Sequence, residues 1–268
     1  MSKKLNDLTV VIKGGGEIAS AIAHRLTRSG FRVCITEVPI PLAVHRGSTY
    51  CEAVFDGEKT VEGLTAKLAT SFEQVKQIWD EGKIPVIVDT GTRIKDYLKP
   101  QVLIDATMLK NNTTTRIDDA PLVIGVGPGF HVGKDVHLIV ESYHDENLGK
   151  VLTSGTALPN TGIPLAIGGY IHERAFHANR DGKFTAVKEL GEIIKPGDII
   201  GDVDGEQLVA EIGGVLRAVL RSDISVKKDT KLAEIDPEAT AEVCFIIRGK
   251  MRAIAGGVLE AILMKYNN

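Results

Sequence analysis

The chain has 268 residues, of which 43% are hydrophobic and 25% charged, and its formal net charge is −3 at pH 7. This length allows one or two domains, each with an ample apolar core. The sequence contains no basic run and no stripe of interleaved aromatic residues, which argues against a nucleic-acid-binding surface.

The ends of the chain and its cysteines bear on location. The first seven residues are polar and lack the apolar core of a signal peptide. The longest late apolar run contains Glu260 and is shorter than the roughly 20 residues that span a bilayer. The three cysteines, Cys34, Cys51 and Cys244, form no CxxC pair, which is typical of a protein in a reducing compartment. We expect Cys34 to be buried and inert, and Cys51 is the candidate for a reactive thiol. We therefore expect a cytoplasmic protein without a membrane partner.

The clearest motif is a glycine-rich turn between a strand and a helix. Apolar residues 8–12 precede Gly14, Gly15 and Gly16, and the spacing of residues 18–26 then indicates a helix. Glycines allow a sharp turn and a close approach to an anion, which the positive end of the helix favours. With Ala19 in the last position, the turn matches G-x-G-x-x-G/A. It predicts a nucleotide or dinucleotide site, although a glycine turn without a ligand gives the same pattern.

An acidic residue follows at the spacing of a dinucleotide-binding fold. Residues 31–36 read as a second strand, and Glu37 comes after it, where such a fold places the acid that holds a ribose hydroxyl. The next segment is a loop that ends in His45 and Arg46. These two side chains could meet a phosphate, while solvated surface charge is their more common fate.

Three later apolar runs, residues 84–88, 102–106 and 122–126, predict parallel strands buried on both faces. Each run ends in small or acidic residues, which should gather at the carboxyl edge of the sheet, where open α/β sheets bind ligands. These endings are Asp89-Thr90-Gly91, Asp105-Ala106-Thr107 and the loop from Gly125 through Gly127 to Gly129. The fold class is therefore α/β, with a Rossmann-like, mostly parallel sheet.

The connections between these strands give weaker signals. Residues 50–61, with the turn dipeptide Asp56-Gly57, predict a hairpin, and residues 64–78 have the spacing of an amphipathic helix. Residues 151–169 form a long functional loop or a linker, in which Pro159-Asn160-Thr161-Gly162 either closes over a ligand or only makes a turn.

The second half of the chain contains an internal repeat. Residues 194–203 recur 32 positions later as residues 226–235. The pattern resembles the two-fold barrel-sandwich of lipoyl and biotinyl carrier domains, but the expected hairpin tip, residues 204–207, has no lysine to modify. The last expected element is a buried helix over residues 253–265, in which Gly256 and Gly257 allow close packing.

These elements predict three parts. Residues 1–170 form the Rossmann-like domain, residues 171–240 the β-rich barrel-sandwich module, and residues 241–268 a C-terminal helix that packs back on the first domain. The seven histidines have no metal-binding spacing, so no metal site is predicted. For His131 two interpretations stay open, a side chain that faces the same edge as the nucleotide loop and a solvated loop residue. No catalytic acid, base or nucleophile can be named.

Several blocks together resemble a bacterial family of accessory proteins of the selenium-dependent molybdenum hydroxylase system, the YqeB type. The blocks are VVIKGGGEIASAIAHRLTRSGF, YCEAVFDG, APLVIGVGPGFHVGKDVH, ALPNTGIP, GGVLRAVL and AIAGGVLEAIL. Members are similar, in the nucleotide-binding half, to XdhC-type chaperones that bind molybdenum cofactor. The resemblance implies a maturation role, with the hydroxylase or its maturation proteins as partners.

The resemblance also implies a ligand and its contacts. The expected cofactor is molybdenum cofactor, as molybdopterin or its cytosine dinucleotide, whose pyrophosphate suits a glycine turn at a helix N-terminus. The implied contacts are Gly14, Gly15, Gly16, Glu17, Glu37 and the loop that contains Gly125, Gly127 and Gly129. The alternative is an NAD-dependent oxidoreductase acting on a small molecule. The oligomeric state, including a homo-oligomer, stays open.

Overall fold

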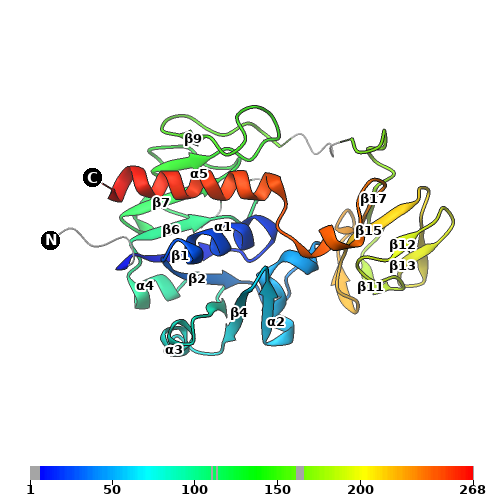
Figure 1. The fold of residues 1–268 in the computed structure, drawn as a ribbon, viewed down its shortest axis with the longest axis horizontal. Helices are drawn as coiled ribbons and strands as arrows, with labels where there is room; N and C mark the ends of the chain where they lie inside the picture. Colours follow the sequence, from blue (N-terminus) through cyan, green and yellow to red (C-terminus); the bar gives the residue numbers. More distant parts are fainter. Residues whose placement is uncertain (1–6, 110, 113, 161–165, 268) are drawn as a thin grey trace. The chain divides into compact units, whose positions relative to one another are not determined.

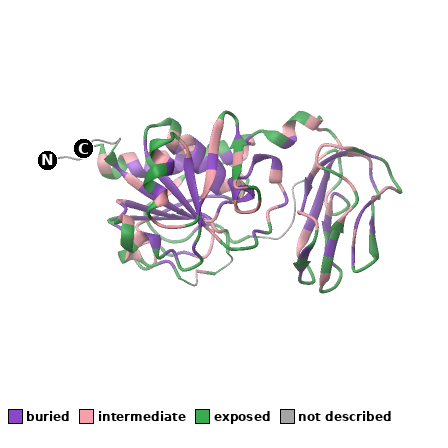
Figure 2. Ribbon diagram, turned by 90° about the horizontal axis from the view of Figure 1, so that it is seen from below, coloured by how far each residue is buried: buried purple, intermediate pink, exposed green. Residues whose placement is uncertain are grey.

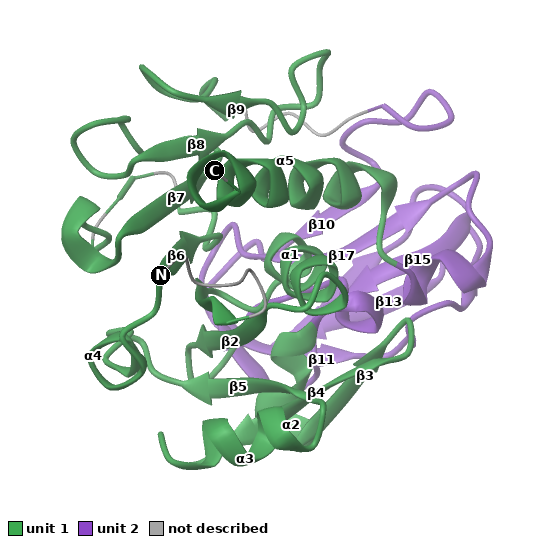
Figure 3. Cartoon of the chain, turned by 60° about the vertical axis from the view of Figure 1, so that its left-hand side comes forward, with its two compact units in different colours: residues 1–41, 50–160, 247–268 green, residues 42–49, 161–246 purple. Residues whose placement is uncertain are grey.

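The computed structural model describes residues 7–109, 111, 112, 114–160 and 166–267. They form two compact units (Figure 3): unit 1 takes residues 1–41, 50–160 and 247–268, and unit 2 takes residues 42–49 and 161–246. The division falls near residues 160 and 246, whereas the sequence suggested 170 and 240. Unit 2 also includes a short segment from within the first half of the chain.

Unit 1 is built on a nine-stranded sheet with the order β3-β4-β5-β2-β1-β6-β7-β8-β9 (Figure 1). The edge strands β3 and β9 pair antiparallel with their neighbours, and all other pairs are parallel. The strands are β1 (Thr9–Lys13), β2 (Arg32–Glu37), β3 (Glu58–Val61), β4 (Leu64–Ala69), β5 (Ile84–Val88), β6 (Val102–Asp105), β7 (Leu122–Val126), β8 (Leu138–Val140) and β9 (Val151–Leu152).

The six strands β5-β2-β1-β6-β7-β8 run in the order 3-2-1-4-5-6 of dinucleotide-binding doubly wound folds. After β5 the chain crosses to the other half of the sheet and forms β6 beside β1. The strand order therefore reverses, in space, between β1 and β6. Ligands of open α/β sheets bind at such a switch point, outside the carboxyl ends of the strands. The α/β class and the large, mostly parallel sheet that the sequence predicted are confirmed.

The central strands are continuous apolar runs because the sheet is covered on both faces (Figure 2). On one face lie helices α1 (Glu17–Arg28) and α5 (Gly249–Tyr266), which share one apolar core with the strands beneath them. On the other face, helices α3 (Gln74–Asp80) and α4 (Ile94–Leu98) cover Val11 and Cys34. Burial raises the pKa of the Cys34 thiol, as expected for an inert core cysteine.

Helix α5 packs closely because of one glycine. A Cβ atom at Gly257 would lie 1.9 Å from the carbonyl oxygen of Gly149, so no larger residue fits without movement. At Gly256 the nearest atom, Arg25 Nη1, would lie 3.8 Å away. Of the two glycines that the sequence singled out, only Gly257 is required by close packing.

Two expectations about residues 50–78 are wrong. Tyr50–Glu52 and Ala53–Asp56 (α2) are helical, and Gly57 ends α2 with a φ of 80° instead of forming a hairpin turn. The hairpin instead joins β3 to β4 through Glu62 and Gly63, with φ of 44° and 82°. Residues 64–69 are therefore a strand, and only α3 remains of the expected helix.

Unit 2 consists of two four-stranded sheets, β10-β17-β15-β12 and β14-β13-β11-β16, in which every pair is antiparallel. Its strands are β10 (Ala175–His177), β11 (Gly182–Ala186), β12 (Ile193–Ile194), β13 (Ile199–Val203), β14 (Glu206–Val209), β15 (Gly214–Val219), β16 (Ile224–Val226) and β17 (Lys231–Asp236). The first copy of the repeat gives β12 and β13, and the second gives β16 and β17. Each copy thus places its short strand in one sheet and its long strand in the other.

The segment of residues 42–49 belongs to unit 2 through backbone contacts. Val219 N–H donates to the carbonyl of Val44 at 2.9 Å, and a Cβ at Gly47 would lie 2.1 Å from the carbonyl oxygen of Cys244. His45 lies 3.9 Å from a carboxylate oxygen of Glu234 and is largely buried. The interpretation of His45 as solvated surface charge is therefore wrong. Within the described part of the chain, no helix is long and apolar enough to cross a membrane.

Candidate functional site

The candidate site lies at the carboxyl edge of the nine-stranded sheet in unit 1, where β1 and β6 separate. The chain leaves β1 through Gly14, Gly15 and Gly16 and enters α1, as the sequence predicted. Gly14 has a φ of 89°, which favours glycine, and its N–H donates to the carbonyl of Thr36 at 2.8 Å. The turn is thus fastened to the neighbouring strand β2.

The three glycines have different surroundings. A Cβ at Gly14 would lie 3.3 Å from Thr107 Cα, and one at Gly15 would lie 3.1 Å from both Cys51 Cβ and Glu37 Oε2. At Gly16 no atom lies within 4 Å of that position. Gly16 is the N-cap of α1, and no side chain caps the helix there. The structure therefore leaves open space beside Gly16, at the positive end of α1.

Glu37 lies on the glycine turn itself. Its Oε2 accepts the N–H of Gly15 at 2.6 Å, and its Oε1 accepts the N–H of Val38 at 2.7 Å. Burial raises the pKa of the Glu37 carboxyl, and these two hydrogen bonds oppose that effect. Each carboxylate oxygen retains further acceptor capacity. Glu37 is therefore at the expected edge, but its first role is to hold the turn.

Cys51 and Ser20 support the turn from the other side. The N–H of Cys51 and the hydroxyl of Ser20 both donate to the carbonyl of Gly15, at 3.0 Å each. Ser20 Oγ in turn accepts the N–H of Tyr50 at 2.8 Å. Cys51 is buried against the turn and packs on Gly15, while its reactivity stays a prediction.

The second glycine loop follows β7. Gly127 and Gly129 have φ of 73° and 104°, and the N–H of Gly127 donates to the carbonyl of Val140 at 2.9 Å. A Cβ at Gly125 would lie 2.5 Å from the Phe130 ring. One at Gly127 would lie 3.2 Å from Met108 Cε. Since Gly14 contacts Thr107, the segment 106–108 touches both glycine turns, and the structure brings the two predicted loops to one edge.

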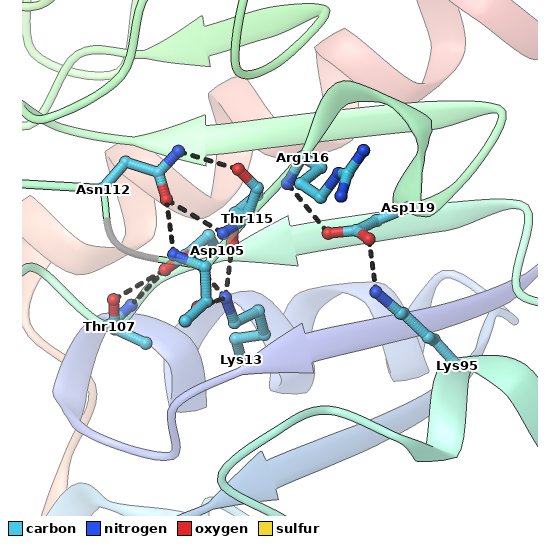
Figure 4. A network of polar contacts seen from close by, with 9 residues as sticks. Lys13, Lys95, Asp105, Thr107, Asn112, Thr115, Arg116 and Asp119 are labelled. Carbon is cyan, nitrogen blue, oxygen red and sulfur yellow. Dashed lines mark hydrogen bonds and ion pairs between the residues drawn. The ribbon is translucent and has the colours of Figure 1, made fainter.

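A buried lysine crosses the switch point beneath this segment (Figure 4). Lys13 Nζ, at the end of β1, lies 3.0 Å from Asp105 Oδ2 at the end of β6, and their side chains are 8% and 5% exposed. Nζ also donates to the hydroxyls of Thr114, at 2.9 Å, and Thr115. Three acceptors satisfy the three N–H groups of the ammonium, so Lys13 has no N–H group left to donate to a ligand.

Asp105 organises the loop that follows it. Its Oδ1 accepts the hydroxyl and the N–H of Thr107, at 2.6 and 3.1 Å, and its Oδ2 accepts the hydroxyl of Thr115 at 2.5 Å. Asn112 closes the loop by donating to the carbonyl of Thr115 at 2.7 Å. Burial alone would raise the pKa of Asp105, but the charge of Lys13 and the threonine hydroxyls lower it. Asp105 is therefore a carboxylate that ties Thr107 and Thr115 to the sheet edge.

The start of α5 brings positive charge to the same edge. Arg248 Nε lies 3.8 Å from Glu17 Oε1, in the first turn of α1. Burial and the charge of Arg248 lower the pKa of Lys250, while Glu17 and Glu141 raise it. Arg248 and Lys250 are about 230 positions away from the glycine turn in the chain, and no motif pointed to them. The sequence reasoning therefore missed both.

Other predicted residues have local roles. Asp89 Oδ2 accepts the N–H of Ile94, the first residue of α4, at 2.7 Å. His131 is exposed, and its Nδ1 lies 2.8 Å from the carbonyl oxygen of Val132. Thr161 and Gly162 of the predicted closing loop lie outside the described residues. Among the residues that are described, no three His, Cys, Asp or Glu side chains are grouped as a metal site.

Comparisons with solved structures show only distant likeness. E. coli tRNA N6-threonylcarbamoyladenosine dehydratase, TcdA, matches 98% of this chain and 89% of its own with 11% identity and a TM-score of 0.33. An aspartoacylase family protein from Mesorhizobium loti matches 87% and 86% with 10% identity and a TM-score of 0.27. At these TM-scores the likeness carries no functional information.

No family model matches the chain. A curated protein of Escherichia coli K12, described as uncharacterized protein YqeB, is 40% identical over 255 residues, which are 95% of this chain. The chain spans 47% of the length of that protein. The YqeB part of the family resemblance is thus supported by a sequence match along nearly the whole chain.

Proposed function

We propose that the chain is an accessory protein that binds molybdenum cofactor, or a nucleotide form of it, and serves the maturation of a selenium-dependent molybdenum hydroxylase. The observation that carries the proposal is the start of α1. It has no side-chain cap, faces open space at Gly16 and lies at the switch point of a doubly wound sheet. A pyrophosphate is the anion that such a helix end suits.

The surrounding residues fit a dinucleotide ligand. The main-chain N–H groups at Gly16 and in the first turn of α1 would meet the pyrophosphate. Glu37 can accept a ribose hydroxyl with the lone pairs that Gly15 and Val38 leave. Arg248 and Lys250 add positive charge near Glu17. The molybdenum cofactor would supply the redox chemistry of the partner enzyme, while this chain holds and orients it.

Unit 2 is proposed to serve docking. Its two antiparallel sheets and the exchanged strands of the repeat are consistent with a barrel-sandwich module. The turn at Asp204 and Gly205, with φ of 49° and 85°, joins β13 to β14 and has no lysine to carry an acyl group. We therefore propose that unit 2 contacts the hydroxylase or its maturation proteins in the cytoplasm and has no covalent carrier role.

The second candidate is an NAD-dependent oxidoreductase acting on a small molecule. The position of Glu37 at the end of β2, beside the glycine turn, favours it. An acid there would accept the ribose hydroxyls of NAD and repel the 2′-phosphate of NADP. This candidate uses the same turn, so ligand identity separates the two functions.

The test is anaerobic calorimetric titration of the purified apo protein with molybdopterin, its cytosine dinucleotide and NAD. Micromolar or tighter binding of a molybdenum cofactor form, with no heat from NAD, supports the maturation role. Binding of NAD alone would replace it with the oxidoreductase. A protein that binds none of the three contradicts both functions.

A matched pair of variants locates the ligand. Gly16→Leu should leave the fold intact, because nothing lies within 4 Å of the added Cβ, and should weaken cofactor binding at least tenfold by covering the end of α1. Gly91→Leu adds the same side chain after β5, two strands from the switch point, where its Cβ would lie 3.6 Å from Arg93 Cγ. Equal affinity in the folded Gly16→Leu variant and the wild type would rule out the glycine turn as the site.

A further inference from the structure

A groove in unit 1 gathers positive charge away from the glycine turn. It has a volume of about 230 Å³ and lies between the second half of α1 and the start of α5. Its walls include His24, Arg25 and Arg28 from α1 and Arg252 from α5. Four basic side chains from two helices therefore surround one small space.

One carboxylate, that of Glu62, lies beside these basic side chains, and it already forms an ion pair with Arg252. Glu62 Oε1 accepts Arg252 Nη2 at 2.5 Å and the N–H of Ile247 at 2.8 Å. Burial tends to raise the pKa of Glu62, but these contacts lower it overall, so Glu62 is ionised and neutralises Arg252. In the described part of the chain neither Arg25 nor Arg28 forms an ion pair. The groove therefore retains two uncompensated guanidinium groups.

His24 adds a polar wall without adding charge at neutral pH. It is 3% exposed, and its Nε2 lies 3.4 Å from the carbonyl oxygen of Glu62. Burial, with the charges of Arg28 and Arg252, lowers the pKa of His24, although Glu62 opposes the effect. The net charge of the groove is thus set by the arginines.

The end of a helix explains part of this arrangement. Arg25 and Arg28 lie in the last turn of α1, where cations offset the negative end of the helix dipole. That effect needs neither the open volume nor a third guanidinium from another helix. The convergence of Arg252 on the same groove is an additional feature.

We propose that this groove binds the phosphoryl group of a small molecule. Guanidinium groups present paired N–H donors that match phosphate oxygens, and two of them are available here. The volume is smaller than the roughly 300–1,000 Å³ of pockets for drug-sized ligands, which suits a phosphoryl head group. Arg25 and Arg28 come 9 and 12 residues after Gly16, about 14–18 Å along the helix at about 1.5 Å per residue. A pyrophosphate on the glycine turn would not reach them, so the site is independent of the proposed function.

The test titrates the full chain with inorganic phosphate, followed by ³¹P NMR at constant ionic strength. Saturable binding should weaken at least tenfold in Arg25→Gln and in Arg28→Gln. Arg28→Lys keeps the charge but loses the paired donors, so its phosphate affinity should lie between those of the wild type and Arg28→Gln. Arg180→Gln removes the same charge from an exposed position in unit 2 and should bind as the wild type does.

Two further arms decide between outcomes. Gly16→Leu should keep phosphate binding in the groove, so a failure of the cofactor proposal and a failure of this one are distinguishable. Unchanged phosphate affinity in the folded Arg25→Gln/Arg28→Gln double variant, or an equal loss in Arg180→Gln, would overturn the site. Tighter binding of hexaglutamate than of phosphate, lost in the same double variant, would replace the phosphoryl ligand with an acidic protein segment.

Discussion

Each unit contains a buried cluster of charged side chains around an ion pair, one at Lys13 and one at Glu234, and these two clusters are built differently. In unit 1, Lys13 faces a single carboxylate, Asp105, and hydroxyl groups complete its contacts. In unit 2, one carboxylate, Glu234, faces two cationic side chains, Arg174 at 2.8 Å and Lys231, and the His45 imidazole at 3.9 Å. The first cluster has one counter-charge, and the second has several.

The difference predicts how each cluster tolerates change. A buried ion with one partner is left uncompensated when that partner is removed, which costs about 3–5 kcal/mol. A carboxylate with several cations keeps most of its stabilisation when one is removed. The Lys13–Asp105 pair also anchors Thr107 and Thr115 near the glycine turn, so its loss should affect the candidate site.

The largest expected effect is that of Asp105→Asn. It should lower the free energy of unfolding of unit 1 by about 3–5 kcal/mol, because Lys13 stays buried without a counter-charge. Urea unfolding followed by the fluorescence of Trp79 measures this, since the single tryptophan of the chain lies in α3 of unit 1. Asp118→Asn, at a side chain that is 68% exposed, is the control and should change the value by less than about 1 kcal/mol. Equal effects of the two variants would contradict the single-partner interpretation.

The next effect, that of Glu234→Gln, depends on pH. Burial alone would raise the pKa of Glu234, but Lys231, His45 and Arg174 lower it from 4.5 to about 2. A lowered carboxyl pKa stabilises the folded state above the unfolded value, and that stability is lost as pH falls from about 4.5 to about 2. At pH 7 the loss on substitution should be about 3 kcal/mol.

Amide hydrogen exchange in β17 at pH 7, with acid unfolding followed by circular dichroism, measures this effect. The wild type should lose stability in unit 2 between roughly pH 5 and pH 2, and the variant should show a flatter profile in that window. An identical acid profile in both proteins would mean that Glu234 has no such role.

The sequence predicted the centre of the fold well because buried parallel strands are continuous apolar runs. Residues 84–88 and 122–126 are strands with those bounds. The prediction of a helix at residues 64–69 was wrong. Leu64 and Leu68 have helical spacing, but the segment pairs with β5 and is a strand. The Asp56-Gly57 dipeptide looked like a hairpin turn, but Gly57 ends a short helix. Local spacing does not distinguish these cases, since tertiary pairing decides them.

The sequence predicted candidate site residues only where the end of a predicted strand marks them. The glycine turn, Glu37 at the end of β2 and the loop from Gly125 to Gly129 follow from strand endings. Arg248 and Lys250 come from the other end of the chain, and His45 pairs with a residue about 190 positions later. Such pairings depend on the folded topology, and no spacing rule records them.

A smaller effect is expected for Lys231→Met. The lysine side chain is 36% exposed, and Glu234 keeps Arg174 and His45 when it is removed. The stability of unit 2 should fall by about 1 kcal/mol, well below the loss for Glu234→Gln. Hydrogen exchange in β17 gives the value. A loss as large as that of Glu234→Gln would show that Lys231 alone compensates the carboxylate.

The smallest effect should come from an ion pair on the surface of unit 2. Lys183 Nζ lies 2.6 Å from Asp223 Oδ1, yet the two side chains are 55% and 71% exposed. Water and salt screen such a pair, so Lys183→Met should change stability by about 0.2–1 kcal/mol, and by less at high ionic strength. Hydrogen exchange in β11 at low and high salt measures both values. A loss of about 3 kcal/mol that persists in high salt would show that contact distance, not burial, sets the strength of these pairs, and the contrast between the two clusters would then lose its physical basis.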